Sequence, residues 1–142
     1  MQVRAVAKYI RMSPRKVQLV VEGIRGRPAA EALAQLQFEP QAAAREVWKV
    51  VRSAVANAEN NYGLDAGDLF VVSATAAQGP SFPKRYRAKA RGQAGLITKR
   101  TTHITVVVDD EPGRQLRAQR AAQRAARAAG ATQARATQAR GR

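Results

Sequence analysis

The stretch GPSFPKRYRAKARGQAGLITKRTTHITVVV, residues 79–108, decides how this chain folds and what it can bind. Its last residues, 104–108, form a β-branched run, and a second such run lies at 69–75. A turn candidate at 91–95 separates the two runs, so the pattern predicts a β-hairpin. The quoted stretch holds seven Lys and Arg, and no acid occurs from residue 69 to residue 108. Because its far half has little apolar surface to bury, we expect the hairpin to lie against a polyanion.

The composition indicates one domain and a basic tail. The chain has 142 residues and a net charge of +15, and cysteine is absent. Residues 1–110, including a hairpin at about 78–103, contain the apolar residues that a core needs. Residues 111–142 are rich in Ala, Arg and Gln, so we expect a tail that is disordered alone or ordered on RNA. No apolar run approaches the roughly 20 residues of a membrane span, so we expect no membrane partner and an intracellular location.

Residues 1–110 predict an α+β fold with three helices and three strands. Alternation predicts a strand over residues 1–10. Ser13 as a side-chain cap and Pro14 in the first turn predict a helix that ends near Gly26. Two further helices are expected over residues 28–36 and over residues 40–60. The remaining two strands are those of the hairpin, 69–77 and 104–108.

Enzymatic chemistry finds little support in this sequence. The only histidine is His103, and the nearest acids, Asp109 and Asp110, lie about 20 Å further along an extended strand. No phosphate-binding glycine loop, dinucleotide motif or spaced set of metal ligands occurs. We therefore expect a protein that is not an enzyme and that needs no metal or cofactor.

The basic and aromatic residues of the hairpin are of the types that bind RNA. Arginine and lysine pair with phosphates, and the rings of Tyr86 and Phe82 are suited to stacking on bases. A second basic cluster lies at the start of the first helix, and a polar face lies on the longest helix. The candidate RNA-binding residues are Arg11, Ser13, Arg15, Lys16, Arg25, Lys49, Arg52, Asn57, Asn60, Asn61, Lys84, Arg85, Tyr86, Arg87, Lys89, Arg91, Lys99, Arg100, Thr101 and His103.

Three alternatives remain open on the residues alone. The hairpin could be a solvated charged surface, although its freedom from acids argues against that. The chain could be a free nucleic-acid-binding or RNA-chaperone protein, which its charge permits. It could be an enzyme that acts on RNA, although it lacks paired acid and base groups.

Three segments together resemble the L-twenty-two family of bacterial large-subunit ribosomal proteins. They are YIRMSPRKVQLVVEGIRGRPAAEALAQLQF (9–38), SAVANAENNYGLD (53–65), and GPSFPKRYRAKARGQA followed by ITKRTTHITVVV. The resemblance covers about residues 2–110 in order and spacing. Gln93 stands where the family has an arginine, and Gly95-Leu96 replaces a more polar pair, so the hairpin tip carries less charge here.

The resemblance implies three helices packed on a three-stranded antiparallel sheet, with a long protruding hairpin. It also implies binding to 23S ribosomal RNA of the large (50S) subunit, support of subunit assembly, and contacts with neighbouring ribosomal proteins in the cytoplasm. No homo-oligomer is expected. The family hairpin reaches the polypeptide exit tunnel, where its tip faces the nascent polypeptide. Carried over by position, the tunnel-lining tip is Lys89, Ala90, Arg91, Gly92, Gln93 and Ala94.

Overall fold

The computed structural model describes residues 1–81, 84–112 and 115. The tail expected at 111–142 therefore lies almost entirely outside the described residues. Within the described residues, three α-helices, five strands and two short 3₁₀ turns follow one another in the order β1 (Gln2–Ile10), α1 (Pro14–Ile24), α2 (Ala29–Phe38), α3 (Ala42–Tyr62), η1 (Ala66–Asp68), β2 (Phe70–Gln78), β3 (Lys84–Ala88), η2 (Ala90–Gly92), β4 (Ala94–Thr98) and β5 (Thr102–Asp109).

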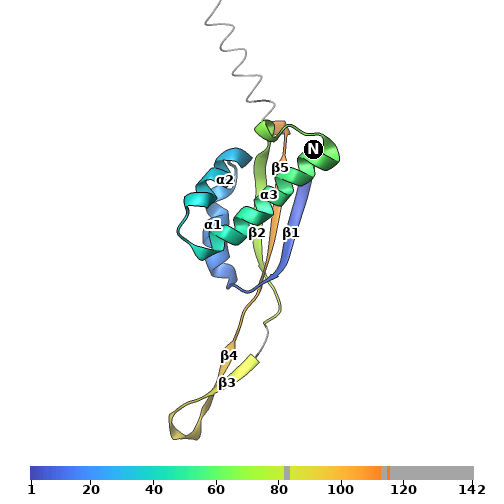
Figure 1. Cartoon of the computed structure of the whole chain (residues 1–142). Coiled ribbons are helices and arrows are strands. Elements are labelled where there is room, and N and C mark those ends of the chain that lie inside the picture. Colours follow the sequence, from blue (N-terminus) through green and yellow to red (C-terminus); the bar gives the residue numbers. More distant parts are fainter. Residues whose placement is uncertain (82–83, 113–114, 116–142) are drawn as a thin grey trace, which may run out of the picture.

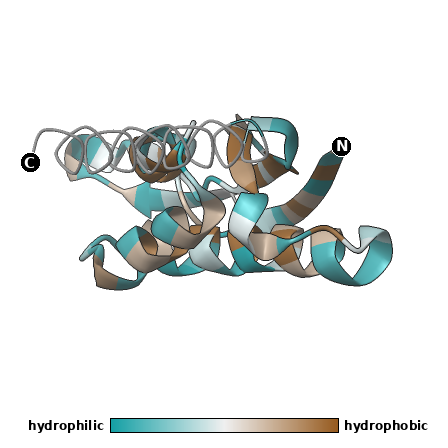
Figure 2. Cartoon of the chain, turned by 90° about the horizontal axis from the view of Figure 1, so that it is seen from above, coloured by the Kyte–Doolittle hydropathy of each residue, from teal (hydrophilic) through white to brown (hydrophobic). Residues whose placement is uncertain are grey.

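The predicted α+β class is confirmed, because three helices accompany antiparallel sheets of three and two strands. The larger sheet has the order β1-β5-β2, and its central strand β5 pairs antiparallel with both neighbours. Successive strand residues face opposite sides of a sheet, so β1 buries Val3 and Ala5 and exposes Gln2 and Arg4. Brown and teal bands on the strand that starts at N in Figure 2 follow this alternation.

The helices build the hydrophobic core against the three-stranded sheet (Figure 1). The α3 helix packs against β1 and β5, and α1 packs against β2. The apolar stripe of α1, which is Val17, Val20, Val21 and Ile24, is buried, as is the stripe of α3 that includes Val47, Val51 and Ala54. On β5, Ile104, Val106 and Val108 are fully buried. This core includes no residue of β3, β4 or the turn between them.

The helix ends agree with the sequence in part. Gly26 and Gly63 follow α1 and α3 with φ of 76° and 61°, the left-handed conformation that favours glycine at a helix end. The prediction that the Ser13 side chain caps α1 is wrong: Ser13 has extended N-cap geometry, but its side chain makes no capping hydrogen bond. Its backbone carbonyl instead accepts from the amides of Lys16 and Val17. The α2 helix also runs past the expected end at Leu36, through Phe38.

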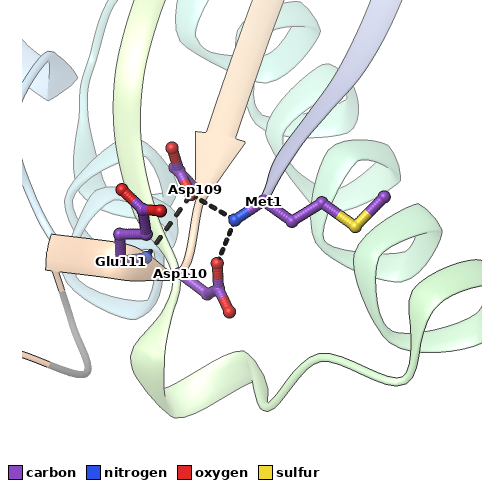
Figure 3. Close-up of polar contacts among 4 residues, drawn as sticks. All are labelled: Met1, Asp109, Asp110 and Glu111. Atoms are coloured by element: carbon purple, nitrogen blue, oxygen red, sulfur yellow. Dashed lines mark hydrogen bonds and ion pairs between the residues drawn. The ribbon is translucent and has the colours of Figure 1, made fainter.

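The two outer ends of β1 and β5 are joined by an ion pair (Figure 3). The Met1 ammonium lies 2.8 Å from Asp109 Oδ1 and also contacts Asp110. Hydrogen bonds to these two carboxylates raise the pKa of the ammonium above its ordinary value of 8.0. Burial alone would raise the pKa of Asp109, but the hydrogen bond from the ammonium and that from the Glu111 amide hold it below 3.8. The ammonium and the Asp109 carboxylate are therefore both charged at neutral pH, and their ion pair links the start of β1 to the end of β5.

The hairpin is built in two sections. At its base, β2 and β5 belong to the core sheet, while β3 and β4 form a separate two-stranded ribbon that projects away from the helices (Figure 1). The turn predicted at 91–95 is wrong in register, because Ala94 and Gly95 pair with Ala88 and Arg87 inside the ribbon. The chain turns at 89–93 instead, where Arg91 and Gly92 both have a positive φ, of 59° and 66°, and glycine adopts this left-handed conformation most readily.

Candidate nucleic-acid interface

A buried threonine fixes the start of α1 against the root of the hairpin. Thr102, which has no exposed surface, donates a 2.7 Å hydrogen bond from its hydroxyl to the carbonyl of Met12. The Met12 amide in turn donates to the carbonyl of Ile10. Tyr9, just before, has a φ of 62° and lies in an irregularity of β1, where the register with β5 shifts between Ala7 and Ile10. These contacts place the segment from Arg11 to Ser13 beside the hairpin.

A close approach of two chain segments directs the ribbon away from the core. The Gly79 amide donates to the Thr101 carbonyl at 2.9 Å, and the Thr101 hydroxyl donates to the carbonyl of Pro80. A Cβ atom on Gly79 would lie 2.6 Å from Thr101 Oγ1, a distance that real Cβ atoms do not reach. Only glycine therefore lets the two segments lie this close together as they pass, side by side, from the core sheet into the ribbon.

A groove of about 910 Å³ separates the ribbon from the start of α1. Cations reach it from both sides, Arg11 from the α1 side and Arg85, Lys99 and Arg100 from the hairpin. Met12, Ser13, Leu96 and Thr98 complete its lining. The fold thus unites the two basic clusters that lie about 70 residues apart in the sequence.

The groove is electrostatically unbalanced. Arg11, Arg85, Lys99 and Arg100 are exposed, and none of them takes part in an ion pair within the described part of the chain. Four like charges around one groove repel one another, and an anion bound between them would relieve that repulsion. Several phosphates in succession match such a groove better than one small anion does, because the cations are spread along its two walls.

A smaller groove of about 430 Å³ continues along α1. Arg11, Ser13 and Lys16 line it together with Leu19 and with Gln41, Ala42 and Ala43 at the start of α3. Arg15 is exposed in the same first turn of α1. Neither helix has an acidic residue in its first turn. The start of α1 therefore extends the basic surface of the larger groove.

The candidates on α3 and at the end of α1 lie apart from this groove. Lys49 Nζ pairs with Glu46 at 3.1 Å, and the guanidinium of Arg52 lies 5.3 Å from the ring centre of Trp48. Arg25 donates a 2.7 Å hydrogen bond to the carbonyl of Ala74 on β2. On the last turns of α3, Asn57 is half-buried, and Asn60 and Asn61 are exposed. That end of α3 lies at the far end of the domain from the ribbon (Figure 1).

Two further candidates make internal contacts. Thr101 is buried and commits its hydroxyl to Pro80, as described above. His103 Nδ1 accepts a 3.1 Å hydrogen bond from the Tyr9 amide, so a neutral His103 carries its proton on Nε2. The Tyr9 and His103 rings also meet edge to face with their centres 4.9 Å apart. Both residues therefore shape the base of the hairpin.

The remaining candidate residues of the ribbon are exposed. Arg85, Tyr86 and Arg87 are exposed on β3, which begins at Lys84. The tip candidates are all exposed, and they occupy the turn at 89–93 together with the first residue of β4, Ala94. The Lys89 amide closes the turn by a 2.7 Å hydrogen bond to the carbonyl of Gln93.

Sequence reasoning missed two residues that line the groove, Met12 and Leu96. Met12 carries no charge and lies between two polar candidates, so no sequence signal marks it. Leu96 lies directly opposite Tyr86 in the ribbon. A correct register for the turn would have identified Leu96 as an exposed partner of Tyr86.

The described residues hold no group of three or more His, Asp or Glu side chains arranged to bind a metal ion. Among the helices of the described chain, none is long and apolar enough to cross a membrane.

Comparison with known proteins places the chain in a family. The family model for Ribosomal protein L22p/L17e matches residues 5–109, which include all of the core except Val3, and the whole hairpin. The chain is 51% identical over 110 residues to Large ribosomal subunit protein uL22 of Clostridium novyi (strain NT), covering 78% of this chain and 98% of that protein. It is 57% identical over 107 residues to the uL22 protein of Synechococcus sp. (strain JA-2-3B'a(2-13)), covering 75% and 86%.

The family match begins within β1, runs through every later strand and helix of the core, and ends where the basic tail begins. The chain therefore belongs to the Ribosomal protein L22p/L17e family and is a structural constituent of the large ribosomal subunit, not an enzyme.

Proposed function

We propose that this chain binds 23S ribosomal RNA through the groove between its hairpin and the start of α1. The observation that carries the proposal is that Arg11, Arg85, Lys99 and Arg100 surround one open groove without a described acidic partner. Such a groove needs a polyanion to neutralise it, and RNA is the polyanion that a large-subunit protein meets. By holding one RNA segment between two parts of the domain, the chain supports assembly of the subunit.

The hairpin also suits insertion into the body of the subunit. Its ribbon contributes nothing to the core, and its tip is exposed on every residue. We propose that the tip from Lys89 to Ala94 lines the polypeptide exit tunnel and faces the nascent polypeptide. Lys89 and Arg91 carry the only charges of the tip, because Ala90, Gly92, Gln93 and Ala94 are uncharged. The tip is therefore a wall surface more than a phosphate-binding one.

The assignment to the large ribosomal subunit also indicates the other partners of the chain. In the ribosome of the cytoplasm, the polar surface of α3, with Lys49, Arg52 and Asn57, is available to ribosomal RNA or to neighbouring large-subunit proteins. Two expectations stay predictions. One is the division into a domain at 1–110 and a tail at 111–142, and the other is that the tail becomes ordered on RNA. No homo-oligomer is needed for any of these contacts.

Sedimentation of cell extracts tests the proposed function. At moderate salt, most of the cellular protein should travel with large ribosomal subunits and remain there after a gradient wash. A free nucleic-acid-binding or RNA-chaperone protein would instead travel with DNA, with other RNA, or in the soluble fraction. Either of those distributions would overturn the ribosomal assignment of the groove.

A further inference from the structure

The pairing of β3 with β4 gives the ribbon two unlike faces. Residues directly opposite each other in an antiparallel pair share a face, and neighbours along a strand alternate. Tyr86 is opposite Leu96, so their side chains lie together on one face. Arg85 opposite Ile97 and Arg87 opposite Gly95 lie on the other face. The ribbon therefore carries Tyr86 and Leu96 side by side on one face and two arginines on the other face.

The apolar pair is exposed on the ribbon. Tyr86 is 77% exposed and Leu96 is 54% exposed, while the core holds no residue of the ribbon. Single exposed apolar side chains are common on protein surfaces. An aromatic ring packed across the strands from a leucine, on a ribbon that nothing described covers, is a small flat apolar surface.

This surface adjoins the basic groove. Leu96 itself lines the groove, as do Arg85, Lys99 and Arg100, so an apolar side chain and cationic groups reach the same groove. A ligand that places its negative charges in the groove therefore has its next atoms beside Leu96 and Tyr86. The charge around the pair also narrows the choice of ligand, because no acid occurs from residue 69 to residue 108.

Few ligands combine closely spaced negative charge with flat apolar rings as RNA does. In a paired A-form helix, both faces of each base are covered by neighbouring bases, and the deep groove keeps side chains from the base edges. An unpaired base has a free face and can swing onto an aromatic side chain. We infer that Tyr86, supported by Leu96, stacks on one unpaired base of the RNA whose phosphates lie in the groove, an inference that rests on the proposed function.

The inference makes the ring of Tyr86, and not its hydroxyl, the binding group. Tyr86→Phe should therefore bind an unstructured oligouridylate as the unchanged chain does. Tyr86→Ala should bind that probe about 5- to 100-fold more weakly, which is the range that loss of one stacked base produces. Tyr86→Leu should also bind more weakly, because it keeps apolar surface without an aromatic face. A duplex RNA with the same number of phosphates should bind all of these variants equally well.

Tyr62→Ala is the matched control, since Tyr62 is a 49% exposed tyrosine at the end of α3, away from the ribbon. All variants should unfold at the temperature of the unchanged chain, because Tyr86 contributes nothing to the core. The full chain is used throughout, at a salt concentration where the unchanged protein binds both probes.

A fluorescent version reports the contact itself. In a chain that carries Trp48→Phe and Tyr86→Trp, the only indole lies on the ribbon. Stacking on the oligouridylate should quench its emission, and saturating duplex RNA should leave the emission unchanged. Equal loss of affinity for both probes in Tyr86→Ala, or no loss for either, would overturn the stacking inference and leave the proposed function intact. If the unchanged chain shows no salt-dependent binding of ribosomal RNA, both the stacking inference and the proposed function are overturned.

Discussion

Replacing Arg85, Lys99 and Arg100 together by Gln will lower the affinity for large-subunit ribosomal RNA by roughly 10²- to 10³-fold at about 0.1 M salt. Each phosphate contact contributes about 0.7 to 0.9 log units of affinity for each tenfold change in salt. The slope of log affinity against log salt should therefore become shallower by about 2 to 3. Filter binding of the full chain to ribosomal RNA over a range of salt concentrations measures both quantities.

A second triple variant makes this test specific to the groove. Arg4, Arg27 and Arg45 are exposed arginines on β1, on the loop before α2 and on α3, and none of them lines the groove between the hairpin and α1. Replacing these three by Gln removes the same net charge. If the groove is the interface, the control variant should keep an affinity within about tenfold of the unchanged chain. Equal losses of affinity in the two variants would show that binding depends only on net charge. That result would contradict the groove as the RNA-binding site.

Replacing residues 82–98 by the two residues Asn-Gly will leave a folded domain that has lost most of its affinity for ribosomal RNA. The unfolding free energy should change by less than about 1 kcal/mol, because the ribbon buries no core residue. The paired backbone of Gly79 and Thr101 remains, and Asn-Gly suits a two-residue hairpin turn between Ser81 and Lys99. Chemical denaturation followed by circular dichroism measures stability, and filter binding measures affinity.

The expected loss of affinity in that variant exceeds roughly 10²-fold. The deletion removes Arg85 and Leu96, and with them one wall of the groove. Replacing Ile104, which is fully buried on β5, by Ala is the opposite control. That change should cost about 2 to 5 kcal/mol of stability while leaving every groove residue in place. Loss of the cooperative unfolding transition in the shortened chain would contradict a hairpin that stands outside the core.

The sequence predicts the core well because its periodic patterns follow from burial. The stripe of Val17, Val20, Val21 and Ile24 is fully or almost fully buried in α1, at the spacing that a helix requires. The alternation of Ile104, Val106 and Val108 is buried on β5 in the same way. Where many side chains favour one arrangement together, a pattern in the sequence is sufficient to find it.

The sequence fails where one local contact competes with another of similar strength. Ser13 is a good capping residue, yet its side chain makes no capping hydrogen bond, and the carbonyl of the preceding Met12 is held by Thr102. Gly92 and Gly95 both suit a turn, and only the pairing of β3 with β4 selects Gly92. In both cases the deciding interaction comes from a distant or opposite strand, which local propensity does not contain.

The groove depends on the same kind of long-range contact. Its two basic clusters are evident in the sequence, but the hydrogen bond from Thr102 to Met12 brings them together. Charge alone also selected Lys49 and Arg52, which the fold places beside Glu46 and Trp48 on α3. Residues of the same type thus differ in role according to their neighbours in space.

A density map of the large ribosomal subunit that contains this chain is the most direct test of the interface. The groove between the hairpin and α1 should hold the backbone of one 23S ribosomal RNA segment, with phosphates in contact with Arg11, Arg85, Lys99 and Arg100. A groove filled by solvent or by another protein, with the ribosomal RNA on other faces of the domain, would contradict this interface.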